Sequence, residues 1–472
     1  MARYEAVIGL EVHAQLRTES KMFCGCSAAF GGEPNTHICP VCLGLPGALP
    51  VVNARAVSFA VRLGLATGCA IAPESIFARK NYFYPDCPKD YQISQFDTPL
   101  CRNGAMKLDN GKVIRIHRIH VEEDAGKLLH VEGADHSLVD MNRSGVPLVE
   151  IVSEPDMRTA AEASEYLQKL RTLVRYLGIC DGNMEEGSLR CDVNLSVRAA
   201  GDEQLGVKTE VKNLNSFKQV EQAVEFEFER QSRVLGEGGR ITQDTLLWDP
   251  ASGRASVMRS KEEAHDYRYF PEPDLRVLRV TAAQMDAIRG DMPELPDAKR
   301  ARFVTHYGIP AYDAGVLTAS REMADYFEAV VTAGADAKAA SNWVMGEVSR
   351  ELNERAVAID AFPLRPQTLA GLVALQTGGK VSSSAAKTVF AALLDAAAAG
   401  RVTTAGALVQ KLGLEQVSDN AAIETEATAV LDENPDEVAR YLGGKEQLLQ
   451  FFVGQLMKRT RGKANPQMAT DL

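Results

Sequence analysis

The segment YEAVIGLEVHAQL, residues 4–16, alternates between two kinds of side chain with the period of two that is typical of a β-strand. One face carries Ile8, Leu10, Val12, Ala14 and Leu16, and the other carries Gly9, Glu11, His13 and Gln15. Side chains two apart share a face, so Glu11 and His13 are predicted to point the same way. This spacing suits two ligands of one ion, although an ordinary solvated face explains it too.

Further strand-like segments carry acidic groups. They are residues 113–127 (VIRIHRIHVEEDAGK), 147–156 (PLVEIVSEPD), 188–198 (SLRCDVNLSVR) and 206–214 (GVKTEVKNL). Carboxylates gathered on one sheet face repel each other unless cations neutralise them. Oxygen ligands with one imidazole suit Mg²⁺ or Mn²⁺, and Mg²⁺ bridges to nucleotide phosphates. Together these segments predict a carboxylate-rich site for metal and phosphate.

Four of the nine cysteines are paired closely in the sequence. Cys24 and Cys26 are followed, after twelve residues, by Cys39 and Cys42, with a loop rich in Gly, Pro and Asn between the pairs. This spacing is typical of a structural zinc site, with His37 as a possible substitute ligand. The alternative is four separate free thiols on a loop. The remaining cysteines are expected to be buried free thiols.

The composition is that of an ordinary globular chain. A length of 472 residues predicts two to four domains, and 45% hydrophobic with 24% charged residues is normal. We find no apolar run near the ~20 residues of a membrane span and no signal peptide in MARYEAV, so we expect the cytoplasm. A net charge of -11 argues against a generic nucleic-acid binder.

A local reversal of charge occurs near the end of the chain. FFVGQLMKRTRGKANP contains Lys458, Arg459, Arg461 and Lys463. Such a cluster on an acidic chain suits contact with nucleic-acid phosphates. The alternative is solvated charge at the end of a helix, where the helix dipole also favours cations.

The composition and the predicted secondary structure of the sequence change near residue 290. Before it, strands and turns dominate, with amphipathic helices predicted at 161–178 and 220–239. After a proline-marked boundary, residues 297–472 are Ala-rich and helical in pattern, and Ser382 is a predicted N-cap. The aromatic segment 79–99 is predicted to be a loop, serving either binding or packing.

Several common catalytic motifs are absent from the sequence. We find no Walker A loop, no G-x-G-x-x-G, no H-E-x-x-H, no G-x-S-x-G and no amidase-type nucleophile segment. If ATP binds, it must use carboxylates, metals and basic side chains. If ammonia is needed, no motif here releases it from an amide.

Long blocks of the sequence resemble one known family, the B subunits of the aspartyl/glutamyl-tRNA(Asn/Gln) amidotransferase. They include VIGLEVHAQL, LPGALPVVN, RKNYFYPDCPKDYQISQFD, HVEEDAGK, SLVDMNRSGVPLVEIVSEPD, MEEGSLRCDVN, EVKNLNSF, DYRYFPEPDL, IPAYDAGVLT, SNWVMGEV and VGQLMKRTRGKANP. These blocks span nearly the whole chain in order. They are therefore far more specific than a single short motif.

The resemblance implies an α+β fold in three parts. A glutamine-synthetase-like cradle with a mixed or antiparallel sheet covers 1–292, with the cysteine insertion at 24–42. An all-helical domain covers 293–404, and a small helical tail domain for tRNA binding covers 405–472. The family is a heterotrimer in which an amidase A subunit makes ammonia from glutamine and a small C subunit stabilises the pair.

The resemblance also implies an activity. ATP phosphorylates the side-chain carboxylate of misacylated glutamyl-tRNA(Gln) or aspartyl-tRNA(Asn), and ammonia then displaces the phosphate. The implied catalytic and metal-binding residues are Glu11, His13, Glu123, Glu150, Asp192 and Glu210, with Mg²⁺ (or Mn²⁺) as the ion. The candidate phosphate-binding residues are Arg190, Lys208 and Lys212. The zinc of the cysteines is expected to be structural.

Two other functions fit parts of the sequence. A stand-alone ammonia ligase for a small carboxylate would use the cradle but leave the helical domains and basic tail unexplained. A non-catalytic tRNA-binding scaffold would retain activity when the carboxylates are replaced, whereas a kinase subunit would not. Affinity for free tRNA tests the small-substrate alternative.

Overall fold

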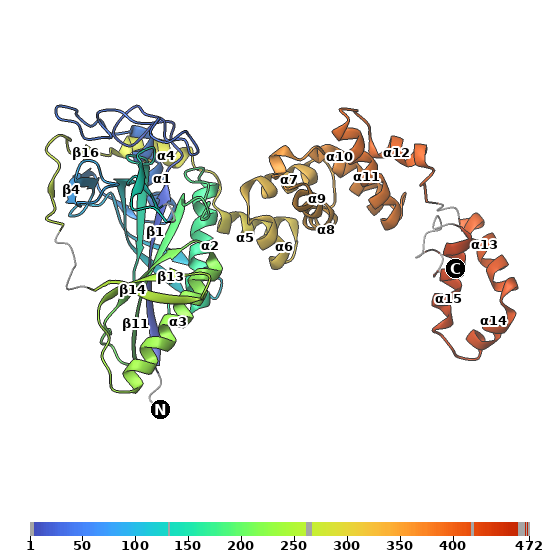
Figure 1. Ribbon diagram of the computed structural model, residues 1–472. Helices are drawn as coiled ribbons and strands as arrows, with labels where there is room; N and C mark the ends of the chain where they lie inside the picture. Colours follow the sequence, from blue (N-terminus) through green and yellow to red (C-terminus); the bar gives the residue numbers. More distant parts are fainter. Residues whose placement is uncertain are drawn as a thin grey trace. The chain divides into compact units, whose positions relative to one another are not determined.

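The chain divides into two compact units, residues 1–295 and residues 296–472 (Figure 1). The computed structural model describes residues 4–130, 133–260, 267–416, 420–460, 468 and 470. All described strands lie in the first unit, and the second unit is helical. The predicted α+β class is therefore confirmed. No helix in these described ranges is long and apolar enough to cross a membrane.

Nine strands of the first unit form one sheet in the order β14-β13-β12-β11-β1-β10-β7-β6-β2. They are β1 (Tyr4–Gln15), β2 (Ala70–Ile71), β6 (Cys101–Lys107), β7 (Val113–Glu123), β10 (Pro147–Ser153), β11 (Leu189–Ala199), β12 (Thr209–Leu214), β13 (Asp244–Asp249) and β14 (Arg254–Ser260). All neighbouring pairs are antiparallel except β12 and β13, which are parallel. The segment at residues 4–16 thus supplies the central strand.

The apolar face of this sheet is covered by helices. The helices are α1 (Ala54–Ala66), α2 (Ala160–Tyr176) and α3 (Phe217–Gly236), and their apolar residues join those of the strands in one core. Ile8, Leu10 and Val12 of β1 are at most 1% exposed, as their alternation predicts. Removing this apolar surface from water is the main stabilisation of the unit. The two helices predicted from the sequence are confirmed as α2 and α3.

Local hydrogen bonds fix where these helices begin. Asn53 caps α1, Thr159 caps α2 and Ser216 caps α3, each by accepting from backbone amides of the first turn. After α2 the chain turns at Gly178, which has φ +67°, a conformation that favours glycine. The helix ends thus follow from the side chains at their boundaries.

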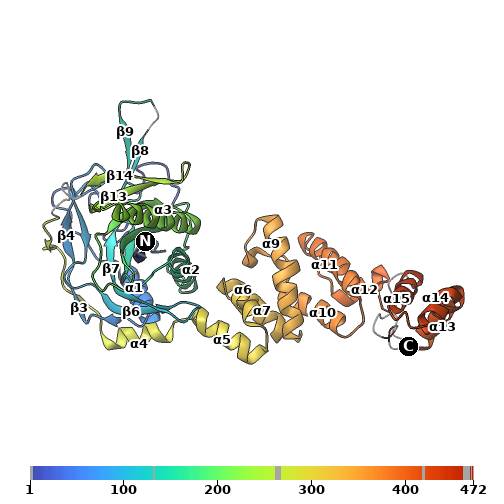
Figure 2. The same cartoon turned by 90° about the horizontal axis from the view of Figure 1, so that it is seen from below.

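Smaller sheets surround the main one. They are β15-β4-β5, with β4 (Ala78–Asn81), β5 (Tyr91–Ser94) and β15 (Phe270–Pro271); the pair β3 (Glu74–Ser75) and β16 (Leu278–Arg279); and the hairpin β8 (Lys127–His130) and β9 (Ser137–Asp140). Figure 2 shows this hairpin extending from the rest of the unit. The prediction that all of 79–99 is a loop was wrong, since residues 79–81 belong to β4 and Tyr91–Ser94 form β5. Residues 82–90 and 95–99 lie outside strands.

The helices near and beyond the boundary are short to medium in length. They are α4 (Ala282–Gly290), α5 (Pro296–Tyr307), α6 (Ala311–Leu317), α7 (Arg321–Thr332), α8 (Ala337–Trp343), α9 (Ser349–Arg355), α10 (Pro366–Thr377), α11 (Ser383–Ala398), α12 (Ala405–Leu412), α13 (Asn420–Glu433), α14 (Pro435–Leu442) and α15 (Leu448–Arg459), with a π-helix at Val344–Val348 and a 3-10 turn at Ile359–Ala361. Ser382 caps α11, as predicted.

In the described part of the second unit, the buried apolar residues form two clusters. Helices α5 to α12 share the larger cluster, to which α12 contributes Ala405 and Val409. The smaller cluster contains Ile423, Val430 and Phe452 from α13 and α15. The predicted domain boundaries after residues 292 and 404 stay predictions.

Glu328 of α7 has a carboxyl group whose pKa is lowered by its partners, so it is expected to make the stability of the second unit depend on pH. Burial opposes its ionisation, but hydrogen bonds from Arg302, Tyr307 and Lys299 outweigh burial and lower its pKa to about 2. The Arg302 and Tyr307 contacts to Oε1 measure 2.6 and 2.9 Å. Because the folded-state pKa lies below the ordinary value of 4.5, the stabilisation is complete above that value and is lost as pH falls through the folded pKa.

We predict that Glu328→Gln lowers the free energy of unfolding by about 1–2 kcal/mol at pH 7, and by much less near pH 2.5. Urea unfolding followed by Trp343 fluorescence, in a Trp248→Phe background, measures this. Glu322→Gln, an exposed position of the same helix, is the control. A loss of stability that does not change with pH would contradict the argument.

Candidate functional site

Strand register assembles the polar face of the main sheet. His13 of β1 lies opposite Glu150 of β10, and Glu150 lies opposite His120 of β7. On the other side of β1, Glu11 lies opposite Asp192 of β11. Directly opposed residues of antiparallel strands share a face, so groups far apart in the sequence converge here. We call this set the carboxylate strip; it comprises Glu11, His13, His120, Glu122, Glu150, Asp192 and Glu210.

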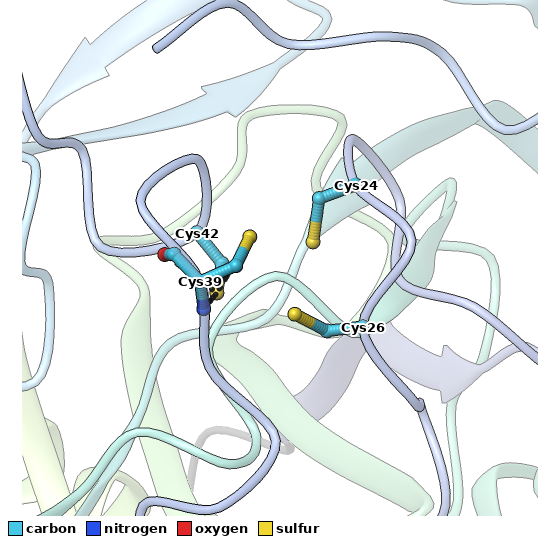
Figure 3. A group of neighbouring side chains, drawn as sticks. All are labelled: Cys24, Cys26, Cys39 and Cys42. Atoms are coloured by element: carbon cyan, nitrogen blue, oxygen red, sulfur yellow. Dashed lines mark hydrogen bonds between the residues drawn. The ribbon is translucent and has the colours of Figure 1, made fainter.

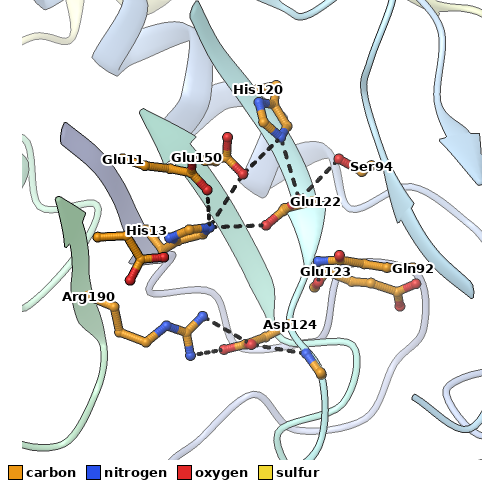
Figure 4. Close-up of polar contacts among 12 residues, drawn as sticks. Glu11, His13, Gln92, Ser94, His120, Glu122, Glu123, Asp124, Glu150 and Arg190 are labelled. Atoms are coloured by element: carbon orange, nitrogen blue, oxygen red, sulfur yellow. Dashed lines mark hydrogen bonds and ion pairs between the residues drawn. The ribbon is translucent and has the colours of Figure 1, made fainter. Parts of the chain in front are cut away.

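His13 lies at the centre of the strip (Figure 4). Its Nε2 atom is 3.3 Å from Glu150 Oε2 and 3.8 Å from both Glu11 Oε1 and Glu122 Oε1. A second imidazole, His120, lies 3.4 Å from Glu122 and 3.7 Å from Glu150. The predicted pairing of Glu11 and His13 on one face is therefore observed, and two more carboxylates join it.

The electrostatics of the strip reflect crowded acidic groups. Burial disfavours protonation of His13, but the hydrogen bond to Glu150 and the charges of Glu150, Glu122 and Asp192 outweigh it and raise its pKa to about 9. Burial and the nearby charge of Glu150 raise the pKa of Glu11. Glu150 is itself buried, yet His120 and His13 hold its pKa well below the ordinary value. The carboxylates thus depend on positive partners.

The strip contains donors suited to a divalent cation. Three groups have ligand atoms within 4.8 Å of one another: Glu11, His13 and Glu150; His120, Glu122 and Glu150; and Glu11, Asp192 and Glu210. Glu11 and Glu150 each belong to two groups. Oxygen donors with a minority of imidazole fit Mg²⁺ or Mn²⁺. The Nδ1 atom of His120 is buried and lacks a hydrogen-bond partner among the residues described.

One predicted site residue lies in a different place from the others. Glu123 does not reach the strip, because consecutive residues of β7 point to opposite sides and its neighbour Glu122 takes that place. Glu123 instead forms a buried ion pair with Lys89 and accepts from the Ile93 amide at 3.0 Å. Figure 4 shows Glu123 beside Gln92, away from His13. Counting by two from His120 would have selected Glu122.

The predicted phosphate-binding cations lie around the strip and are engaged with acids or amides. Arg190 donates to both oxygens of Asp124 at 3.0 and 3.1 Å. Lys212 lies 2.5 Å from Asp192 and 3.1 Å from Glu210. The exposed Lys208 donates to Asn194 at 3.1 Å.

Sequence reasoning missed two cations beside the strip. Arg118 lies 3.3 Å from Glu150. Lys80 is half-buried, and burial disfavours its charge, but Glu122 and other nearby groups outweigh burial and raise its pKa. Arg118 lies two residues before His120 on the same strand, so the strand period could have placed it on the same face. Lys80 belongs to another sheet, so no period in the sequence relates it to the strip.

The four predicted cysteines converge in space (Figure 3). Their sulfurs all lie within 4.8 Å of one another, and those of Cys39 and Cys42 are 3.9 Å apart. A tetrahedral site with metal–sulfur bonds of about 2.3 Å has sulfur atoms about 3.8 Å apart, so the group can bind a metal ion. His37 is not a member of this group. The other cysteines are buried free thiols, as predicted.

A cavity of about 200 Å³ lies beside the cysteines. Its lining includes Cys24, Cys42, Lys89, Tyr91 and Glu123. The ion pair of Glu123 and Lys89 therefore faces a separate space from the strip.

The predicted basic tail is only partly described. Lys458 and Arg459 lie in the last turn of α15, whereas Arg461 and Lys463 lie outside the described residues. Arg459 contacts Glu426 and Glu433, each at 2.6 Å. A cavity of about 590 Å³ between α14 and α15 is lined in part by Arg440 and Lys445. The positive charge of the tail is thus spread beyond the four predicted residues.

Comparison with known proteins covers nearly the whole chain. Residues 6–286 match the family described as the GatB/GatE catalytic domain, and residues 325–472 match the GatB domain. A relative from Chlorobium luteolum, the B subunit of an aspartyl/glutamyl-tRNA(Asn/Gln) amidotransferase, is 57% identical over 473 residues, covering 100% of this chain and 98% of the relative. Relatives of the same name from Chlorobaculum tepidum and Syntrophotalea carbinolica are 55% and 54% identical, with 98% of each relative covered.

Proposed function

The chain belongs to the GatB family of tRNA-dependent amidotransferase B subunits, and from that premise we propose that it amidates misacylated tRNA. The substrate is glutamyl-tRNA(Gln), aspartyl-tRNA(Asn) or both, and ATP drives the reaction. The observation that carries the proposal is the carboxylate strip, whose donors suit cations that accompany nucleotide phosphates. A pure scaffold would have no use for it.

The first step activates the substrate carboxylate. A side-chain oxygen of the attached amino acid attacks the γ-phosphorus of ATP, the bond to the β-phosphate oxygen breaks, and ADP leaves. The substrate then carries an acyl phosphate, which has a good leaving group. Bound Mg²⁺ or Mn²⁺ would neutralise charge on the transferring phosphate. Glu11, His13, Glu122, Glu150, Asp192 and Glu210 would hold these ions, with His120 as a further donor.

The cations around the strip would orient the phosphates. Arg190, Lys208 and Lys212 would exchange part of their present contacts with acids and amides for phosphate oxygens. Their positions at the side of β11 and β12 support this role. Arg118 and Lys80 would do the same from the opposite side. Cations on both sides suit a transition state whose charge is spread over several oxygens.

The second step forms the amide. The ammonia nitrogen attacks the acyl carbon, the bond from carbon to the phosphate oxygen breaks, and phosphate leaves with the electron pair. One proton is lost from nitrogen. We propose that ammonia comes from glutamine through an amidase A subunit, in a heterotrimer with a small C subunit. The sequence supports a separate source, since no amidase-type nucleophile segment was found. Charging of tRNA for translation suits a cytoplasmic location.

The cysteine group would hold a structural zinc ion. Four thiolates form a closed tetrahedral set that leaves no position for a substrate. Zinc would fix the insertion at 24–42 against the cavity lined by Lys89 and Glu123. A structural role therefore separates this ion from those of the strip.

We predict that Glu11→Gln or His13→Ala lowers ATP-dependent phosphorylation by roughly 100-fold or more, because ion binding is lost. The reconstituted complex, assayed with both misacylated tRNAs, measures phosphorylation and amidation. Glu5→Gln is the matched control, since Glu5 lies on the same strand but pairs with Arg198. Glutamine hydrolysis by the partner should persist. Full phosphorylation in both strip variants would favour the scaffold.

We predict about one zinc ion per chain, lost when Cys24 and Cys26 are both replaced by serine. Elemental analysis of the purified chain gives the count. The double variant Cys69→Ser and Cys180→Ser is the control, because these thiols lie outside the group. Metal-free wild-type protein with native fold and activity would disprove a structural zinc.

We predict that the tail after residue 405 contacts tRNA phosphates. Replacing Lys458, Arg459, Arg461 and Lys463 by glutamine should weaken tRNA binding and reduce its salt dependence by roughly one unit of slope for each cation that no longer meets a phosphate. Titrations between low and moderate salt measure the slope. Arg289→Gln, an exposed arginine of α4, is the control. An unchanged slope would place the tRNA contacts elsewhere.

A further inference from the structure

An aromatic group lies on the small sheet β15-β4-β5. In that sheet Phe270 pairs with Arg79, and Lys80 pairs with Gln92. The pairing continues beyond β15, since the Asn81 amide donates to the Tyr267 carbonyl at 3.0 Å. Tyr267 and Tyr269 therefore run alongside β4, next to Lys80.

Two rings of this group are stacked. The centroids of Phe96 and Tyr269 are 4.1 Å apart and their planes differ by 8°. Tyr267 contacts Tyr269 edge-on, with centroids 6.0 Å apart. Phe96 forms the outer member of the stack and is 52% exposed. A parallel stack that ends in a half-exposed ring can extend by one more flat aromatic group.

The residue before the exposed ring is anchored by buried hydrogen bonds. This residue, Gln95, is 2% exposed. Its side chain donates to Ser75 Oγ at 2.6 Å and accepts from the amides of Val121 and Leu100 at 3.0 and 3.3 Å. A ring fixed in this way loses little conformational entropy when a ligand stacks on it. The position of Phe96 is thus set by a buried network that includes β7.

The aromatic group is joined to the carboxylate strip. The Lys80 ammonium lies 4.9 Å from the centroid of the Tyr267 ring. Ser94 of β5 donates to Glu122 Oε2 at 3.0 Å, which fixes the small sheet against the strip. Lys80, flanked by the rings and the carboxylates, can contact a phosphate that lies between the two. The order along this path is ring, ammonium and carboxylate.

We propose that the stacked pair of Phe96 and Tyr269 binds the adenine base of ATP, with Lys80 on the phosphates that lead to the carboxylate strip. This inference rests on the proposed function and names the base-binding part of that site. A nucleotide has the matching order of flat base, sugar, phosphates and metal. Stacking on an aromatic ring contributes strongly to binding and is tolerant of base identity.

The test compares two ligands that differ in the base. Full-length chain with Mg²⁺ is titrated by calorimetry with a non-hydrolysable ATP analogue and with inorganic tripolyphosphate. Phe96→Ala should weaken binding of the analogue by about tenfold or more and leave the affinity for tripolyphosphate unchanged. Phe96→Trp should retain analogue binding. Phe30→Ala, at a 74% exposed phenylalanine of the cysteine insertion, is the control.

Three outcomes would overturn the inference. If Phe96→Ala binds the analogue with unchanged affinity, Phe96 does not contact the base. If the affinity for the analogue and for tripolyphosphate falls equally, the substitution has disturbed the site in general. If the variant binds the analogue normally but has a raised KM for aminoacyl-tRNA, the Phe96 ring contacts the end of the tRNA instead of the nucleotide base. Failure of the proposed function is seen separately, as retained phosphorylation in the strip variants, and does not alter the comparison of the two ligands.

Discussion

Repulsion between neighbouring carboxylates is the constraint on which the first unit depends. The antiparallel register of β1 with β10 and β11 brings Glu11, Glu150 and Asp192 onto one face. Such a face is stable only when positive charge accompanies it. His13 and Lys212 supply some of this charge from within the sheet. Bound cations would supply more. Without them the clustered carboxylates destabilise the fold, so the arrangement is better suited to binding cations than to stabilising the sheet.

Burial of the apolar face of the same sheet offsets the unfavourable repulsion between these carboxylates. The core of β1 and the helices α1 to α3 stabilises the strands from behind. Ionic groups therefore need not stabilise the fold, and their positions can serve binding. The sheet therefore has one apolar face that stabilises the fold and one polar face whose side chains suit cation binding.

Much of this could be read from residues alone. The alternation in residues 4–16 predicted the central strand and the shared face of Glu11 and His13, and cysteine spacing predicted the converging thiols. Partners from other elements could not be found in this way. Lys80 reaches the strip from a separate sheet, and the fixed ring of Phe96 depends on Gln95 contacting β7 across 26 residues of sequence. Glu123 was selected because it lies in the motif HVEEDAGK. The strand period of two, counted from His120, instead favours Glu122.

The alternation at the end of β7 has a consequence for how such chains can change. Glu122 serves the carboxylate strip, and Glu123, one residue later, serves the buried contact with Lys89. A substitution at either position affects one side. A single-residue insertion or deletion within β7 would exchange the two sides at once. Length in this stretch is therefore more tightly restricted than residue identity, and natural variants should show replacements there without gaps.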